Sequence, residues 1–316
     1  MIEVTNLTKV FGAKVAVDNI SFRVEKGEVL GFLGPNGAGK STTMRMVTGY
    51  LPPTGGTVTI EGNDIVDAEL AAKVKIGYLP ENAPLYNDMS VEDFLAFCAE
   101  VRGMSGVERS KAVDRALDTC FLQPVRHQSI DTLSKGYRHR TCFAQSIIHD
   151  PDVLILDEPT DGLDPNQKHE VRGLIRRMGE KKVIIFSTHI LEEVEAACTR
   201  AIVIDRGKVV ADGTPAELKS KSTAAGQVRV RATGLAGTGI RQELEKLSEV
   251  KSVTVIDSGD NYFSGVCEAT KAGNGEVSKA VFRMCVDRKL VLEELSPEEG
   301  RLDDVFREMT RSDTED

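Results

Sequence analysis

One segment of eight residues restricts the possible folds of this 316-residue chain more than any other. Its sequence is Gly34-Pro35-Asn36-Gly37-Ala38-Gly39-Lys40-Ser41, which fits the pattern GxxxxGK[ST]. The apolar run Val29–Leu33 precedes it, and a helical pattern follows that Gly49 is expected to end. Glycines allow backbone N–H groups to approach phosphate oxygens without an intervening Cβ, and the helix directs the positive end of its dipole at the same anion. The segment therefore predicts a strand, a phosphate-binding loop and a helix in succession.

The same loop predicts how a nucleoside triphosphate and its metal ion are held. The Lys40 ammonium is expected to bridge the β- and γ-phosphates of ATP, and the Ser41 hydroxyl is expected to bind Mg²⁺. The loop residues predicted to contact the nucleotide are Gly34, Pro35, Asn36, Gly37, Ala38, Gly39, Lys40, Ser41 and Thr42. ATP and Mg²⁺ are therefore the predicted cofactors.

A second segment supplies two adjacent carboxylates. Asp157 and Glu158 directly follow the apolar run Val153–Leu156, which predicts a buried strand. Because α/β sheets bind ligands at the carboxyl ends of their strands, both side chains are expected beside the phosphate-binding loop. Asp157 is the predicted partner of Mg²⁺, directly or through water. Glu158 is predicted to act as the general base on the attacking water, a role typically worth about 10²–10⁴-fold in rate.

Up to about residue 220, short apolar runs alternate with helical patterns, as in an α/β domain with a largely parallel sheet. Buried strands are predicted at Val29–Leu33, Val153–Leu156, Val183–Phe186 and Ala201–Ile204. Near the N-terminus an apolar–polar alternation predicts half-exposed antiparallel strands at Ile2–Leu7, Ser21–Val24 and Thr57–Ile60. The region from about 85 to 150 shows helical patterns at Val91–Val101 and Val107–Phe121. It is expected to form a helical subdomain.

The rest of the chain, 227–316, is expected to form a smaller α+β domain after a linker at 221–226. Strands are predicted at 228–232, 250–256, 262–268 and 290–295, and helices at 240–247, 277–288 and 301–309. The order βαββαβ with one further helix is typical of a ferredoxin-like sandwich. This part of the sequence shows no catalytic grouping, so we expect it to have a dimer-stabilising or regulatory role.

Composition and charge exclude several classes of protein. Hydrophobic residues make up 41% of the chain and charged residues 28%, which indicates a globular protein rather than a disordered or fibrous one. The net charge of −9 opposes general attraction to nucleic acid, so no nucleic-acid partner is expected. No apolar run approaches the ~18 residues needed to span a bilayer, and the start lacks the pattern of a secretion signal. Six dispersed cysteines without a CxxC pair favour reduced thiols. We therefore expect a soluble, acidic, intracellular protein.

A third segment precedes a helical stretch and has the sequence Leu133-Ser134-Lys135-Gly136-Tyr137. Ser134 and Gly136 could offer a hydroxyl, a backbone N–H and a helix dipole to an anion, although a serine here often serves only as a helix cap. Together with the loop and the two carboxylates, this segment resembles the LSGGQ signature of the ATP-binding subunits of ABC transporters. Asp161-Gly162-Leu163-Asp164 resembles the D-loop of the same family.

Two single residues extend the resemblance. His189, after Ser187 and Thr188, resembles the switch histidine that senses the γ-phosphate in this family. Phe11 resembles the aromatic residue that stacks on adenine. The resemblance implies an α/β P-loop NTPase cassette over 1–220, with a RecA-like parallel sheet core, an antiparallel β subdomain and a helical subdomain.

The family resemblance also implies the partners. Each ATP in this family lies between the P-loop of one subunit and the signature of the other, which implies a homodimer in which Ser134, Gly136 and Asp164 contact nucleotide held by a second copy. A separate ABC-2 type transmembrane permease is the implied partner. The implied location is peripheral, on the cytoplasmic face of the cell membrane.

The chain departs from the common family pattern at two places. Glu81 stands where the Q-loop commonly has glutamine, and we expect its carboxylate to bind Mg²⁺ or to position water. Lys135 and Tyr137 replace a glycine and a glutamine of the signature. These variants resemble the ABC-2 exporter branch, which includes sodium- and drug-export ATPases. The N-terminal half looks especially close to the gliding-motility-associated ATP-binding subunit, and Leu302–Phe306 resembles the LEDVF-type helix of many such subunits.

Two other functions stay open at this point. A soluble ABC ATPase of translation would carry two cassettes per chain, and one of DNA maintenance would carry a long coiled coil before Asp157, where no sustained heptads occur. A P-loop kinase would leave the signature segment, Asp164 and His189 without a function. The sequence favours the exporter ATPase, and it does not identify the transported substrate.

Overall fold

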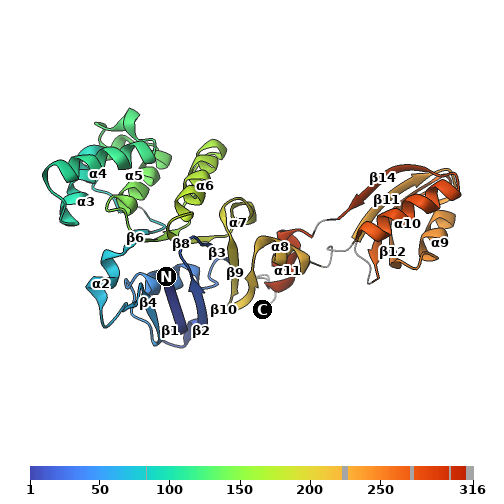
Figure 1. Ribbon diagram of the computed structural model, residues 1–316, viewed down its shortest axis with the longest axis horizontal. Helices are drawn as coiled ribbons and strands as arrows, with labels where there is room; N and C mark the ends of the chain where they lie inside the picture. Colours follow the sequence, from blue (N-terminus) through green and yellow to red (C-terminus); the bar gives the residue numbers. More distant parts are fainter. Residues whose placement is uncertain (83, 223–226, 271–273, 299, 311–316) are drawn as a thin grey trace. The chain divides into compact units, whose positions relative to one another are not determined.

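The computed structural model describes residues 1–310 except Ala83, 223–226, 271–273 and Glu299 (Figure 1). These residues form two compact units, made up mainly of Met1–Pro215 and of Ala216–Glu308. The first unit contains two clusters of buried apolar residues and the second contains one. Most of the predicted linker, from 223 to 226, lies outside the described residues.

A six-stranded sheet forms the centre of the first unit, in the order β10-β9-β3-β8-β7-β6. All neighbouring pairs are parallel except β10 with β9. The strands are β3 (Val29–Leu33), β6 (Ile76–Leu79), β7 (Val153–Asp157), β8 (Val183–Thr188), β9 (Arg200–Asp205) and β10 (Lys208–Gly213). Every residue of β3, β7 and β8 is buried, because alternate side chains enter the two apolar clusters on opposite faces of the sheet. The predicted parallel core is confirmed.

The predicted antiparallel sheet is also present, with the order β2-β1-β4-β5. Its strands are β1 (Ile2–Phe11), β2 (Lys14–Val24), β4 (Gly55–Ile60) and β5 (Asn63–Asp64). The first two are longer than the sequence predicted. Asn6 and Asn19 have φ of 51°, and the pairing of β1 with β2 shifts register between Val4 and Leu7. These irregularities interrupt the apolar–polar alternation but let the strands continue to Phe11 and Lys14.

The α-helices in the described residues of the cassette are α1 (Lys40–Val47), α2 (Glu69–Val74), α3 (Val91–Val101), α4 (Gly106–Thr119), α5 (Lys135–Ile147), α6 (Pro165–Gly179) and α7 (Leu191–Ala197). Gly49, with φ of 68°, follows the end of α1 as predicted. Helices α3, α4 and α5, green in Figure 1, pack together around one apolar cluster. They confirm the predicted helical subdomain.

The second unit contains an antiparallel sheet in the order β12-β13-β11-β14. Its main elements are β11 (Gln227–Thr233), α9 (Gly237–Glu245), β12 (Val250–Ser258), β13 (Tyr262–Ala269), α10 (Asn274–Asp287) and β14 (Val291–Pro297). Apolar residues of α9 and α10 pack on one sheet face and close the core. The predicted ferredoxin-like sandwich is confirmed. Short helices α8 (Pro215–Ser220) and α11 (Leu302–Met309) lie before and after it in the chain.

Two further expectations concern the whole described chain. No helix in residues 1–310, with the gaps given above, is both long and apolar enough to cross a bilayer. All six cysteines are free thiols, and four of them are buried.

Candidate functional site

A pocket of the first unit has a volume of about 560 Å³ and lies where β3, β7 and β8 end. It brings together residues from both sheets and from the loops that follow the parallel strands. The predicted site residues that line it are Phe11, Asn36, Gly37, Gly39, Lys40, Ser41, Thr42, Glu81, Glu158 and His189. Gly34, Pro35 and Ala38 belong to the same loop but do not line the pocket.

The glycines of the loop between β3 and α1 are required by its geometry. Gly39 precedes α1 with φ of 109°, and a Cβ there would lie 2.6 Å from the Ala16 carbonyl oxygen. A Cβ on Gly34 would lie 2.5 Å from the Ile204 carbonyl oxygen. The loop can therefore pass close to the backbones of β2 and β9 and turn into the helix only if both positions lack a side chain.

Lys40 is the first residue of α1, and its side chain is only 6% exposed. Its Nζ donates hydrogen bonds to the carbonyl oxygens of Gly34, at 2.8 Å, and Pro35, at 3.2 Å. Burial lowers the pKa of Lys40, and the nearby Glu158 carboxylate opposes that shift at 3.8 Å. The ammonium therefore lies between the loop and the carboxylates of β7, where it can pair with phosphate oxygens.

Asp157, the last residue of β7, is fully buried. Its Oδ1 accepts hydrogen bonds from the hydroxyls of Ser41, at 3.2 Å, and Ser187. Its Oδ2 is buried without a hydrogen-bond partner. A buried carboxylate oxygen without a partner is costly, and a hard cation would satisfy it.

These oxygen donors fit Mg²⁺, which proteins commonly hold through one or two groups together with substrate phosphates and water. Ser41 and Asp157 would hold the ion, and Glu81 lines the same pocket as Ser41. Within the described parts of the chain, no group of three or more His, Cys, Asp or Glu residues could hold a metal ion by itself.

Glu158 points into the pocket although the preceding Asp157 is buried beneath it. Its φ of 51° turns the chain at this residue, and its backbone N–H donates to the Ser187 carbonyl at 3.2 Å and hydroxyl at 3.1 Å. The Glu158 Oε2 atom lies 3.0 Å from Nδ1 of His189. Burial raises the pKa of Glu158, while its hydrogen bond with His189 acts in the opposite direction. A carboxylate with a raised pKa facing the loop is suited to general base catalysis.

The predicted site residues of the signature segment and the D-loop also lie outside this pocket. Ser134 caps α5 by accepting a hydrogen bond from the Tyr137 N–H at 3.4 Å, and Asp164 caps α6 by accepting one from the Gln167 N–H at 2.9 Å. Gly136 is buried, and a Cβ there would lie 2.5 Å from Oε1 of Gln167. Within a single chain, the signature residues therefore lie apart from the pocket that the phosphate-binding loop forms.

Sequence reasoning missed other residues at the site. Lys14 and Ala16 line the pocket from β2, opposite Phe11 across the turn at Gly12. Their position follows from the irregular pairing of β1 with β2, which leaves no clear pattern in the sequence. Asp161 also lines the pocket and forms an exposed ion pair of 2.9 Å with Lys135 of the signature.

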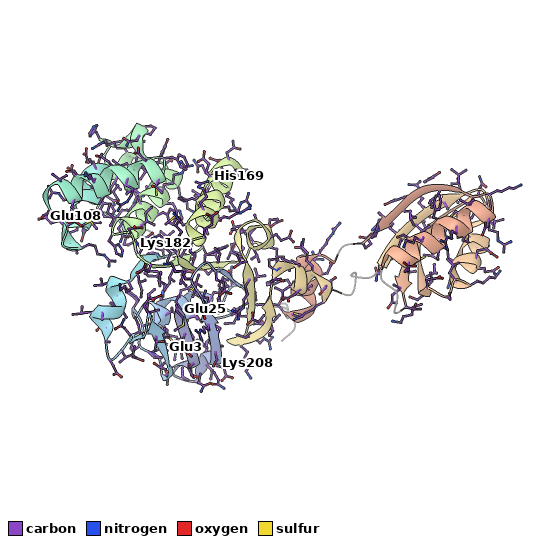
Figure 2. All side chains as sticks on the ribbon, in the orientation of Figure 1. Glu3, Glu25, Glu108, His169, Lys182 and Lys208 are labelled. Carbon is purple, nitrogen blue, oxygen red and sulfur yellow. The ribbon has the colours of Figure 1, made fainter. Side chains whose placement is uncertain are left out.

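A second hollow, of about 790 Å³, lies on the first unit between α2, β6 and the helices α3 and α4. Its lining includes exposed apolar side chains: Tyr50, Leu70, Val74, Phe97 and Val101. Glu108, labelled in Figure 2, and Tyr78 also line it. Burial raises the pKa of Tyr78 to about 12, so its phenol stays neutral in ordinary conditions. We call this hollow the apolar groove.

Comparisons with known proteins agree with this geometry. Residues 17–161 match the family described as ABC transporter. The chain is 39% identical over 223 residues to the probable multidrug ABC transporter ATP-binding protein YbhF of Escherichia coli (strain K12), a match that covers 70% of this chain and only 38% of YbhF. It is 33% identical over 256 residues to the linearmycin resistance ATP-binding protein LnrL of Bacillus subtilis (strain 168), covering 81% of this chain and 82% of LnrL.

A similar solved structure is the dimeric post-hydrolysis state of the ATP-binding cassette MJ0796 bound to ADP and Pi. Its TM-score is 0.62 at 25% identity, and the likeness covers 68% of this chain and 98% of that one. The family match includes the phosphate-binding loop, the signature segment and the two carboxylates of Asp157 and Glu158. The predicted family is confirmed: this chain belongs to the ATP-binding subunits of ABC transporters, which are ATPases.

Proposed function

We propose that this chain is the ATP-binding and ATP-hydrolysing subunit of an exporter and couples dimer closure and opening to a separate membrane permease. One observation carries the proposal: Lys40, Glu158 and His189 meet in one pocket directly above the buried Asp157. The relatives named for multidrug transport and linearmycin resistance support export. They do not favour a soluble ATPase of translation or DNA maintenance.

In the proposed reaction the γ-phosphate is transferred to water. Glu158 takes a proton from the attacking water, and Lys40 pairs with the oxygens of the β- and γ-phosphates. His189, which contacts Glu158 at 3.0 Å, would turn to the γ-phosphate when ATP is present. Ser41 and Asp157 would hold Mg²⁺, with Glu81 in the same pocket, and the bound ion would neutralise charge on the phosphates. Phe11, 48% exposed at the pocket, offers its ring to adenine.

We further propose that two copies enclose two ATP molecules. Ser134, Gly136 and Asp164 do not line the pocket of their own chain, so a nucleotide there lacks their contacts. The dimeric state of the similar cassette supports a second copy as their source. ATP would close the dimer because phosphate contacts form across it, and hydrolysis would remove them.

The permease partner is proposed to be of the ABC-2 type and to use the apolar groove. Exposed apolar side chains gathered in a hollow are suited to contact with another protein. Tyr78 lines this groove and Glu81, three residues later, lines the nucleotide pocket, so one short segment reaches both. Such a subunit would be peripheral on the cytoplasmic face of the membrane. The C-terminal unit would stabilise the dimer or regulate it.

Two measurements test the proposed function. The purified chain should hydrolyse ATP in the presence of Mg²⁺, and tagged chain expressed in its native cell should co-purify with a polytopic membrane protein. Replacing Phe97 and Val101 by Asp should break that association and leave the hydrolysis of the isolated chain unchanged. Co-purification with ribosomes or DNA instead would contradict the exporter assignment.

A further inference from the structure

A buried carboxylate connects the segment that follows β7 with the last residue of β8. Glu193, on α7, is 1% exposed. Its Oε2 accepts a hydrogen bond from the Thr188 hydroxyl at 2.6 Å, and its Oε1 accepts one from the Thr160 hydroxyl. Both threonines are also buried. Within the described residues Glu193 forms no ion pair, and its side-chain oxygens have only hydroxyl partners. Burying a carboxylate without an ion pair lowers the free energy of unfolding.

The two threonines flank the residues proposed to carry out hydrolysis. Thr160 lies two residues after Glu158, and Thr188 directly precedes His189. Glu158 and His189 contact each other at 3.0 Å. The Glu193 carboxylate therefore connects the same two segments a second time, through residues that do not line the pocket.

The direction of the hydrogen bonds makes this link specific. The Thr188 hydroxyl accepts a hydrogen bond from the Ile190 N–H at 3.0 Å, so its single hydrogen is free to point at Glu193. A hydroxyl fixed in this way constrains the backbone on both sides of His189. Neither hydroxyl, nor Glu193, lines the pocket.

We propose that Glu193 is a positioning residue: by bridging Thr160 and Thr188, its carboxylate holds Glu158 and His189 at the geometry that activates the attacking water. It touches neither nucleotide nor metal ion. The inference rests on the proposed role of Glu158 as general base. A displacement of about 1 Å at a reacting group can cost about 10²-fold in rate, so a loose link should affect turnover more than binding.

The threonines provide a matched test in the full-length protein. Thr188→Val keeps the shape of the side chain but removes the donor, whereas Thr188→Ser keeps the donor. We expect Thr188→Val to lower kcat for Mg-ATP hydrolysis by about tenfold or more, and Thr188→Ser to stay within about threefold of the unsubstituted chain. The Kd for ATP should change by less than about twofold in both variants. Thr160→Val and Thr160→Ser should behave in the same way.

Further variants separate positioning from stability. Glu193→Ala should reproduce the loss of kcat, and the double variant Thr160→Val, Thr188→Val should cost little more than either single one, because each alone breaks the bridge. If Glu193→Ala does not fold, the kcat values of the valine and serine variants still test the proposed positioning role. Equal kcat in the valine and serine variants would overturn the inference, as would a valine variant whose only change is a lower thermal midpoint. An inactive unsubstituted chain would instead contradict the proposed function.

Discussion

The nucleotide pocket and the signature segment differ in how the fold uses their polar groups. In the pocket, Lys40, Glu158 and His189 converge from three separate elements and face a shared space. In the signature, the Ser134 hydroxyl does not line that pocket, and it caps a helix by accepting a hydrogen bond of 3.4 Å from the Tyr137 N–H. The residues of the pocket fit a triphosphate, whereas the signature residues do not contribute to that pocket. This difference indicates that one chain supplies only part of each nucleotide site, which is why we propose that a second copy completes it.

The largest expected effect comes from the pocket side. Glu158→Gln should lower kcat for ATP hydrolysis by about 10²–10⁴-fold, because the amide cannot accept the proton of the attacking water. ATP binding, measured by calorimetry, should persist. Glu192→Gln, which changes an exposed carboxylate on α7, serves as the control and should leave turnover unchanged. Hydrolysis at the full rate by Glu158→Gln would contradict the assignment of Glu158 as the general base.

The next effect tests the signature side. Ser134→Asp should preserve α5, because aspartate caps a helix as well as serine does. It should also place a negative charge against the phosphates held by a second copy, and like charges across an interface cost several kcal/mol. We expect ATP hydrolysis to fall about 10²-fold with an unchanged thermal midpoint.

Ser105→Asp makes the same change at the start of α4. The residues of α4 take no part in the proposed nucleotide contacts of either copy. It should hydrolyse ATP at the ordinary rate. If Ser105→Asp and Ser134→Asp lose activity equally, the loss comes from the helical subdomain as a whole, and the proposed signature contact is wrong.

A smaller effect should appear at the adenine end of the pocket. Stacking of a base on an aromatic side chain is worth about 1–3 kcal/mol, so Phe11→Ala should weaken ATP binding about tenfold. Phe11→Tyr should bind ATP normally, because the ring remains. Affinity for inorganic tripolyphosphate, which lacks a base, should be the same in all three proteins. A parallel loss for tripolyphosphate would show that Phe11 supports the loop rather than adenine.

The smallest expected effect concerns Glu81. Glu81→Gln removes one negative charge at the pocket but keeps an oxygen that can bind Mg²⁺ or water. An exposed charge pair is worth about 0.2–1 kcal/mol, so the Mg²⁺ concentration for half-maximal hydrolysis should rise by about 1.4- to fivefold. Titration of hydrolysis with Mg²⁺ at saturating ATP measures this shift. No shift would indicate that Glu81 does not contribute to the metal site.

The sequence predicted the parts of the molecule that depend on local patterns. The strands β3, β7 and β8 are fully buried runs, and the loop after β3 needs its glycines at fixed positions. The strand β6 was not predicted, because Gly77 weakens the pattern of a strand. That glycine is required by tertiary structure: a Cβ there would collide with the Ser146 carbonyl oxygen of α5.

The parts that depend on distant contacts could not be read in the same way. Glu193 appears in the sequence as one acidic residue among several, and only the fold brings Thr160 and Thr188 to its carboxylate. The sequence predicts Asp157 and Glu158 as a pair, but it does not predict that Asp157 is buried while Glu158 lines the pocket. This difference follows from the turn at Glu158, whose φ is 51°. The likeness to gliding-motility subunits, the homodimer and the ABC-2 permease stay predictions.

The most direct test of the central claim is the mass of the Glu158→Gln protein in solution, measured by light scattering with and without Mg-ATP. The account predicts a monomer without nucleotide and a dimer with it, because the trapped triphosphate joins one copy's loop to the other copy's signature. Adding Ser134→Asp to the same protein should keep ATP bound and prevent the dimer. A monomer at saturating Mg-ATP, or a dimer that Ser134→Asp does not disturb, would contradict the shared nucleotide site.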